Sequence, residues 1–153
     1  MLRPARLNEA QAMAEMSRDL IESGLGWRYT PQRMAVLIGD AESTALVACD
    51  ASGIQGFAIM QFGDERAHLS LLCVQPAQRR LGIARSLNEW LVDSARVAGM
   101  VSIQLELRAD NAAALAFYQH LGFTVTQTVP GYYGSHLAAR RMVRWLRPDA
   151  AMS

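Results

Sequence analysis

The sequence predicts an α+β fold with one mixed sheet, and three observations support this prediction. Apolar runs of strand length recur along the chain, four segments have apolar residues at helical spacing, and Gly or Pro separates most segments. The expected order is strand, two helices, three strands, helix, strand, helix and two strands. With 153 residues, 51% of them hydrophobic, the chain can form its own core. We therefore expect a single domain over residues 1–146, with about seven strands and four flanking helices, and a frayed tail at 147–153.

The first half of the chain is expected to contain two helices and four strands. The helices are expected at 9–22 and 31–38, and the strands at 2–7, 44–49, 54–62 and from 66 or 67 to 74. Pro4 limits the first strand to a sheet edge. Asn8 is expected to cap the first helix, and Thr30 followed by Pro31 the second. The last three strands are expected to form an antiparallel meander.

The second half alternates helices and strands. Helices are expected at 82–98 and 112–121, and strands at 101–107, 123–129 and 137–146. Gly99 and Gly122 are expected to end the two helices, and Asp110 or Asn111 to cap the second. Because a helix separates the strand ending at 74 from the strand at 101–107, we expect these two strands to be parallel, in a right-handed crossover.

The composition limits the classes of function. The net charge of +1 gives no electrostatic indication of nucleic-acid binding. All basic residues other than histidine are Arg, so lysine chemistry is excluded. Cys49 and Cys73 lie in apolar runs and are expected to be reduced residues of a cytoplasmic protein. No apolar run reaches the roughly 20 residues of a membrane span. His120 and His136 have no partners at metal-ligand spacing, so no metal is expected.

An anion site is predicted where a strand gives way to a helix, at Gln78-Arg79-Arg80-Leu81-Gly82-Ile83-Ala84. The first turn of a helix has backbone N–H groups without intrahelical partners, and they attract anions. Gly82 and Ala84 allow close approach of a ligand, and Arg79, Arg80 and Arg85 add positive charge. A surface turn followed by a helix is the alternative. The stretch matches neither a Walker loop nor a dinucleotide-binding fingerprint.

A second motif gives the sequence a family resemblance. It consists of Leu105-Glu106-Leu107-Arg108-Ala109-Asp110-Asn111, the helix through Tyr118, and Leu121-Gly122-Phe123. Together with Arg79-x-x-Gly82-x-Ala84 and Gly131-Tyr132-Tyr133, it resembles the GNAT superfamily of N-acetyltransferases over residues 45–145. The second motif is most similar to the ribosomal-protein N-terminal acetyltransferases of that superfamily.

The resemblance implies a site for acetyl-coenzyme A. The pyrophosphate would bind backbone N–H groups from Arg79 to Ala84, and the pantetheine arm would run between the parallel strands ending near Val74 and Leu107. A backbone N–H near Cys73 or Val74 would polarise the thioester carbonyl. The cofactor-binding residues implied are Cys73, Val74, Arg79, Arg80, Leu81, Gly82, Ile83, Ala84, Arg85, Asn111, Ala114 and Tyr118.

The resemblance also implies roles in proton transfer. Tyr118 would be the general acid that protonates the departing thiolate, and Glu106 the general base that deprotonates the amine. A core tyrosine and a strand carboxylate paired with Arg108 or another Arg are the alternatives. The strand at 67–74 has no acidic residue, so His68 and Ser70 are its polar candidates for the base.

The acceptor is expected to be a primary amine, either a small metabolite or a peptide N-terminus, that attacks directly in a ternary complex. Trp27, Tyr29, Tyr132 and Tyr133 are the candidate acceptor-binding residues. Aromatic residues without an acidic cluster argue against aminoglycosides and polyamines. The alternatives are a non-catalytic acyl-coenzyme A sensor and an aminoacyl-tRNA acetylating toxin. The resemblance also implies a possible homodimer.

Overall fold

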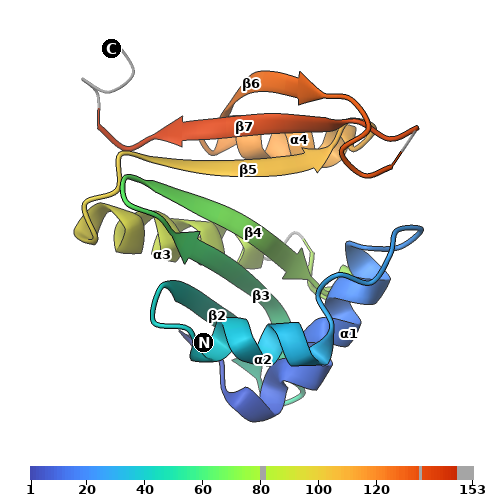
Figure 1. Cartoon of the computed structure of the whole chain (residues 1–153). Helices are drawn as coiled ribbons and strands as arrows, with labels where there is room; N and C mark the ends of the chain where they lie inside the picture. The colour runs from blue at the N-terminus through green and yellow to red at the C-terminus, as the bar shows by residue number, and fades with distance from the viewer. Residues whose placement is uncertain (80–81, 135, 148–153) are drawn as a thin grey trace. The chain divides into compact units, whose positions relative to one another are not determined.

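The computed structural model describes residues 1–79, 82–134 and 136–147 (Figure 1). The described chain contains these elements in order: β1 (Leu2–Pro4), the 3-10 turn η1 (Leu7–Glu9), α1 (Ala10–Leu20), α2 (Pro31–Gly39), β2 (Ser43–Asp50), β3 (Gly53–Phe62), β4 (Arg66–Val74), the 3-10 turn η2 (Pro76–Gln78), α3 (Ile83–Val97), β5 (Ser102–Arg108), α4 (Ala112–His120), β6 (Thr124–Val129) and β7 (Ala139–Trp145). The strands form one sheet in the order β1-β2-β3-β4-β5-β7-β6. The predicted α+β class and element order are confirmed.

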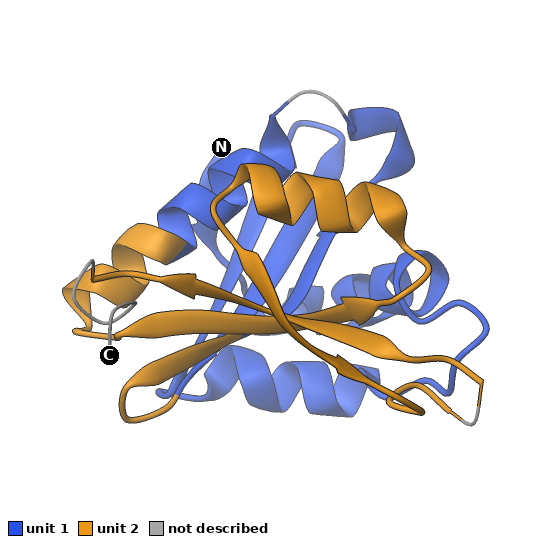
Figure 2. Ribbon diagram, turned by 90° about the horizontal axis from the view of Figure 1, so that it is seen from above, with its two compact units in different colours: residues 1–62, 69–91 blue, residues 63–68, 92–153 orange. Residues whose placement is uncertain are grey.

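The chain divides into two compact units, which Figure 2 colours separately. Unit 1 consists of residues 1–62 and 69–91, and unit 2 of residues 63–68 and 92–153. The beginning of β4 therefore belongs to unit 2 and its end to unit 1. No helix within the described ranges is long and apolar enough to cross a membrane.

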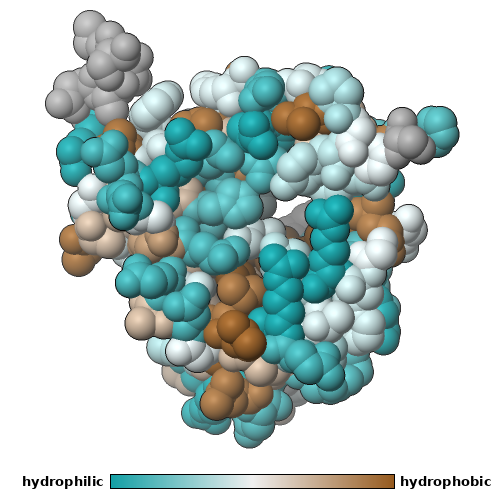
Figure 3. Space-filling view, viewed as in Figure 1, coloured by the Kyte–Doolittle hydropathy of each residue, from teal (hydrophilic) through white to brown (hydrophobic). Residues whose placement is uncertain are grey.

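Unit 1 has its core between the apolar sides of α1 and α2 and the inward-facing residues of the strands. Met13 of α1, Met34 of α2 and Phe57 of β3 are fully buried in this core. β1 and β3 both pair with β2 in antiparallel register, as the meander predicts for β2 and β3. The outward face of α2 is mixed, since Figure 3 shows hydrophobic side chains beside hydrophilic ones over this helix and Val36 is exposed.

The start of the chain differs from the prediction. The first strand ends at Pro4 rather than at residue 7, and residues Leu7–Glu9 form a 3-10 turn before α1. Asn8 does not cap α1. Instead, the Glu9 carboxylate accepts from the backbone N–H of Arg6 at 2.8 Å and from the Arg3 guanidinium at 2.8 Å. The N-cap residue of α1 is Glu9, which makes no side-chain cap bond to α1, and its carboxylate instead closes the preceding 3-10 turn.

The first helix ends at Leu20 rather than at residue 22, but the predicted cap of α2, one of the two candidate caps of α4 and the glycines after α3 and α4 are confirmed. Thr30 accepts from the backbone N–H of Arg33 at 3.3 Å at the start of α2. Of the two candidates for the cap of α4, Asn111 is the one used, since it accepts from Ala114 at 3.0 Å. Gly99 and Gly122 follow α3 and α4 with φ of +80° and +95°, where glycine avoids the strain of a Cβ.

Unit 2 is built on β5. The beginning of β4 pairs with β5 in parallel register, His68 opposite Gln104, as the crossover argument predicts. β7 pairs with the other edge of β5 in antiparallel register, and β6 pairs with β7. Figure 2 shows α4 lying along these strands. Leu105 and Leu107 are buried on one face of β5, which leaves Glu106 on the opposite face.

Candidate functional site

A polar cluster surrounds Glu106 in unit 2. The side chain of Glu106 is 6% exposed, and its Oε1 lies 2.7 Å from Nε2 of His68. Oε1 also accepts from the Tyr132 hydroxyl at 3.3 Å, while Oε2 accepts from Arg141 Nε and Gln104 Nε2, each at 3.0 Å. Strand register explains the arrangement, because His68 is opposite Gln104 and Arg141 is opposite Glu106. We call these five residues the Glu106 cluster.

The cluster keeps Glu106 ionised. Burial raises the pKa of this carboxyl, but hydrogen bonds and charges from His68, Arg141 and Gln104 outweigh burial and lower the pKa to about 2. An ionised carboxylate can only accept, so His68 donates to it from Nε2. The alternative of a carboxylate paired with an Arg therefore holds through Arg141, while Arg108 forms an ion pair with Asp110 at 3.3 Å. Glu106 is therefore a weak proton acceptor at neutral pH and a strong partner for a cationic imidazole.

Tyr118 lies on α4 in unit 2. Its ring makes edge-to-face contacts with Phe117 and Phe123, with ring centroids 5.1 and 5.5 Å apart. Burial raises the pKa of the phenol, so the hydroxyl keeps its proton at neutral pH. This hydroxyl forms no hydrogen bond with any residue that the structure describes. It is therefore a protonated donor available to a ligand.

The four aromatic candidates for acceptor binding are divided between the units. Tyr132 joins the Glu106 cluster and makes an edge-to-face contact with Tyr133, with ring centroids 4.8 Å apart. In unit 1, Trp27 Nε1 donates to the carbonyl of Ala14 at 3.3 Å. The guanidinium of Arg33 lies 4.3 Å from the centre of the Tyr29 ring, a cation–π contact. Within unit 2, Tyr132 therefore contacts the predicted catalytic residue Glu106.

The start of α3 in unit 1 has the geometry of an anion site. Gly82 is exposed with φ of +77°, and its carbonyl accepts the first helical hydrogen bond, from Ser86 at 2.9 Å. The N–H groups of Ile83–Arg85 precede that bond and have no intrahelical acceptor. Arg79 is exposed, and Arg85 is half-exposed 3.8 Å from Glu89. Arg80 and Leu81 lie outside the described residues.

Gly56 is a position that sequence reasoning missed. A Cβ there would lie 2.8 Å from the carbonyl oxygen of Cys73 and 3.2 Å from a methyl of Val74, so only glycine lets β3 approach the end of β4 this closely. The same Cβ would lie 3.4 Å from a methyl of Ile83, at the start of α3. A glycine inside a strand pattern is the available signal, because it often indicates close backbone approach. Gly56 thus fixes the end of β4 against the start of α3.

The remaining predicted cofactor residues have local structural roles. Cys73 is buried, and burial raises the pKa of its thiol to about 12, so the thiol is not a nucleophile at neutral pH. Cys49 is only partly buried, and no disulfide joins the two. Asn111 uses its side-chain carbonyl as the cap of α4, on the backbone N–H of Ala114. In the described ranges, no group of three or more His, Cys, Asp or Glu residues could hold a metal ion.

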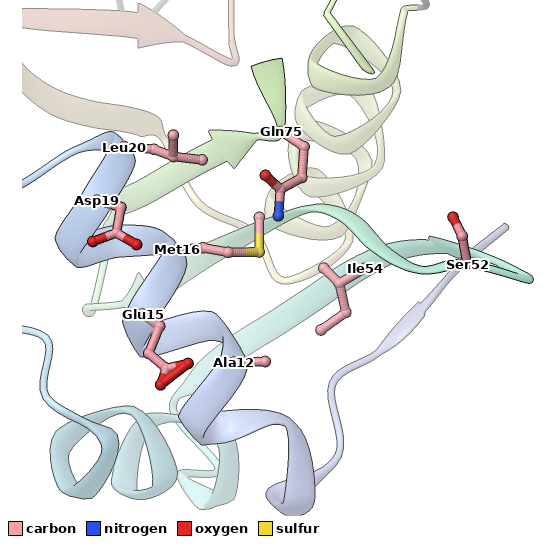
Figure 4. Close-up of a pocket in the computed structure, with 8 residues that line it drawn as sticks. All are labelled: Ala12, Glu15, Met16, Asp19, Leu20, Ser52, Ile54 and Gln75. Carbon is pink, nitrogen blue, oxygen red and sulfur yellow. The ribbon is translucent and has the colours of Figure 1, made fainter. Parts of the chain in front are cut away.

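Unit 1 also contains a cleft of about 420 Å³ that the sequence did not indicate (Figure 4). Residues of α1 line one side, and residues near the ends of β2, β3 and β4 line the other. The lining residues are Ala12, Glu15, Met16, Asp19, Leu20, Ser52, Ile54 and Gln75. Both carboxylates already have partners, Gln11 for Glu15 at 2.8 Å and Arg18 for Asp19 at 2.8 Å.

The sequence is similar to those of known acetyltransferases. The model of the acetyltransferase (GNAT) family matches residues 12–123. Over 77 residues the chain is 42% identical to a ribosomal protein bS18-alanine N-acetyltransferase of Salmonella typhimurium. The matched segment covers 50% of this chain and 52% of that protein. Over 68 residues it is 37% identical to naa20 of Schizosaccharomyces pombe, the catalytic subunit of the N-terminal acetyltransferase B complex, covering 44% of this chain and 38% of that protein. The chain thus spans about half the length of the first curated relatives it matches, and less of naa20.

Two solved structures resemble this chain over nearly its whole length. The ribosomal-protein-S18-alanine N-acetyltransferase from Escherichia coli superposes with a TM-score of 0.83 at 24% identity, covering 95% of this chain and 93% of that one. Ard1 from Thermoplasma volcanium superposes with a TM-score of 0.84 at 25% identity, covering 95% and 96%. The fold of this chain is therefore the fold of these proteins.

Proposed function

The chain belongs to the acetyltransferase (GNAT) family, and we propose that it transfers an acetyl group from acetyl-coenzyme A to the α-amine of a peptide or protein N-terminus. The observation that carries this proposal is the Glu106 cluster, which holds a carboxylate, an imidazole and a phenol together on one face of β5. The names of the relatives, a ribosomal-protein alanine acetyltransferase and an N-terminal acetyltransferase subunit, favour an α-amine over a small metabolite. We further propose that the protein acts in the cytoplasm, where ribosomal proteins are made.

We assign cofactor binding to the start of α3. The open first turn, the exposed Gly82 and the small Ala84 fit a pyrophosphate, because backbone N–H groups can then reach the phosphate oxygens directly. Arg79 adds positive charge beside this turn, as do Arg80 and Arg85 in the sequence. When bound, the coenzyme supplies the activated acetyl thioester.

We assign removal of the amine proton to His68, with Glu106 as its partner. An α-amine has an ordinary pKa of about 8 and is largely protonated at neutral pH, so it must lose a proton before it attacks. A carboxyl with a pKa of about 2 accepts that proton poorly. An imidazole is the side chain that most often takes up a proton as a general base. Glu106 then orients the ring through the 2.7 Å hydrogen bond and stabilises the imidazolium.

We assign the general-acid role to Tyr118. The sulfur that leaves the acetyl group needs a proton, and burial keeps the phenol of Tyr118 protonated until it is required. The hydroxyl is not used in a hydrogen bond with any described residue, so it is available for this purpose. Tyr132, Tyr133, Trp27 and Tyr29 remain the proposed acceptor-binding residues.

The experiment that tests the proposal uses the whole chain, acetyl-coenzyme A and a panel of amines. The panel contains peptides with a free N-terminus, the same peptides with a blocked N-terminus and an internal lysine, small-molecule amines, and aminoacyl-tRNA. Thiol release measures turnover, and mass spectrometry locates the acetyl group. We expect turnover only with free N-termini. Turnover restricted to small amines or lysine side chains would contradict the proposal.

The same panel separates the two alternative functions. A sensor would show a higher melting temperature with acetyl-coenzyme A but no turnover on any acceptor. A toxin of the aminoacyl-tRNA class would turn over only the charged tRNA. Failure of acetyl-coenzyme A to raise the melting temperature at saturating concentration would overturn the cofactor assignment itself.

A further inference from the structure

The segment between α1 and α2, residues 21–30, carries Trp27 and Tyr29 and begins with a buried acidic residue. We call this segment the α1–α2 loop. Glu22 is only 6% exposed. Its Oε1 accepts from the backbone N–H groups of Arg28 at 2.6 Å and Tyr29 at 3.2 Å. Its Oε2 accepts from the hydroxyl of Ser17, itself fully buried on α1, at 2.8 Å.

The partners of Glu22 are unusual for a buried carboxylate. Burying a charge is costly unless it is paired and hydrogen-bonded, and buried acids are commonly paired with a cation. Within the part of the chain that the structure describes, Glu22 has no ion pair, and its donors are one hydroxyl and two backbone N–H groups. The carboxylate of Glu22 therefore fixes the backbone at Arg28 and Tyr29. This use is typical of a group that fixes the conformation of a loop.

The two N–H groups that donate to Glu22 belong to Arg28, which lies between Trp27 and Tyr29 in the sequence, and to Tyr29 itself. Fixing the peptide units of Arg28 and Tyr29 sets the direction in which the Trp27 and Tyr29 side chains leave the loop. Both rings have further contacts. Trp27 donates to the Ala14 carbonyl and lies 5.1 Å from the Arg18 guanidinium, and the Tyr29 ring lies 4.3 Å from the Arg33 guanidinium. Trp27 nevertheless remains 37% exposed. An ordered, partly exposed aromatic surface binds a ligand with less loss of conformational entropy than a mobile one.

We propose that Glu22 is a positioning residue, which holds the α1–α2 loop in the conformation that receives the acceptor peptide through Trp27 and Tyr29. The proposal rests on the proposed function, because that function defines the acceptor. Glu22 contacts neither the peptide nor the coenzyme in this account. It acts through the backbone of the loop, and its removal affects acceptor binding rather than the chemical step.

The test compares Glu22→Ala with Glu22→Gln and with the control Glu42→Ala, which removes an exposed carboxylate between α2 and β2. Glutamine keeps a side-chain carbonyl for the two backbone N–H groups and can donate to Ser17. We expect Glu22→Ala to raise the KM for the peptide about tenfold, the equivalent of roughly 1.4 kcal/mol, with kcat and the KM for acetyl-coenzyme A within about twofold of wild type. Glu22→Gln and Glu42→Ala are expected to stay near wild type.

Hydrogen exchange provides a readout that needs no turnover. The backbone amides of Arg28 and Tyr29 are expected to exchange faster in Glu22→Ala than in wild type. If Glu22→Ala does not fold, Ser17→Ala serves in its place, because it removes one donor and leaves the carboxylate.

The outcomes separate this inference from the function on which it rests. Wild-type turnover with an unchanged peptide KM in Glu22→Ala overturns the inference alone. A fall in kcat with no change in the peptide KM also overturns the inference, because that result would show that Glu22 affects the chemical step. Absence of turnover by the wild-type chain on every peptide overturns the proposed function and this inference with it.

Discussion

Glu22 of unit 1 and Glu106 of unit 2 are both 6% exposed, Glu22 as a residue and Glu106 in its side chain, yet their partners differ in kind. Glu22 accepts from one hydroxyl and two backbone N–H groups, so its charge holds a loop in place. Glu106 accepts from four side chains, among them Arg141 and His68, and its pKa falls to about 2. The comparison shows that the donors around a buried carboxylate, rather than its burial, indicate its role. Backbone donors indicate that it fixes the conformation of a loop, and charged side-chain donors indicate that it stabilises a neighbouring positive charge.

The most direct test of this difference replaces glutamate by glutamine at both positions. Glu106→Gln removes the charge that faces His68 and is expected to lower kcat about 10²- to 10³-fold, in the range of lost general acid–base assistance. Glu22→Gln keeps an acceptor for the two backbone N–H groups and reverses the bond to Ser17, so it is expected to change kcat less than twofold. Steady-state kinetics on a free-N-terminus peptide measures both variants. Equal losses at the two positions would contradict the distinction.

A second prediction concerns the acid rather than the carboxylate. Tyr118→Phe keeps the ring contacts with Phe117 and Phe123 but removes the hydroxyl, so we expect kcat to fall about 10- to 100-fold with little change in stability. Thiol-release kinetics and a thermal melt provide the measurements. Turnover unaffected by the substitution would show that Tyr118 only packs in unit 2.

The third prediction uses the pH dependence of stability. The pKa of Glu106 lies below that of an unfolded glutamate, so its contribution to stability is complete above about pH 4.5 and is lost as the pH falls towards 2. The shift corresponds to about 3 kcal/mol at most. Urea unfolding at several pH values should show a smaller loss between pH 5 and 3 for Glu106→Gln than for wild type. The same loss in both proteins would show that Glu106 is not stabilised as an anion.

The smallest expected effect is that of Ser17→Ala. It removes one neutral donor from Glu22 and should lower the free energy of unfolding by about 1 kcal/mol, the usual worth of one buried hydrogen bond. The matched control is Ser52→Ala, which removes an exposed hydroxyl that donates to Asp50 at 2.6 Å. Urea unfolding measures both. A loss in Ser17→Ala no larger than in the control would show that the hydroxyl does not help to hold Glu22.

Sequence periodicity and local signals predicted the features of the fold that depend on residues close together in the sequence. The strand alternation placed Glu106 opposite the buried face of β5. The helix-start signal at Thr30 and the helix-end signals at Gly99 and Gly122 are confirmed. Asn8 failed as a cap because Glu9, the next residue, holds the chain start through Arg3 and Arg6. Local signals therefore predict most element ends, except where a charged neighbour competes.

What sequence could not predict depends on pairing between distant segments. Arg141 reaches Glu106 only because β7 pairs with β5 in one register, and a shift of one residue would turn it to the other face. The partners of Glu22 lie six and seven residues further along an irregular loop, where no period applies. The resemblance, rather than any pattern, indicated Tyr118 and Tyr132 as site residues, and the roles of Tyr118, Tyr132 and the start of α3 stay predictions.

The central claim is that His68, held by Glu106, accepts the proton of a peptide α-amine. The most direct test is the pH dependence of kcat/KM for wild type and His68→Gln on one peptide with a free N-terminus. We predict that kcat/KM of wild type rises with pH, and that His68→Gln is slower and lacks this part of the profile. The same pH dependence and the same rate in both proteins would contradict the account.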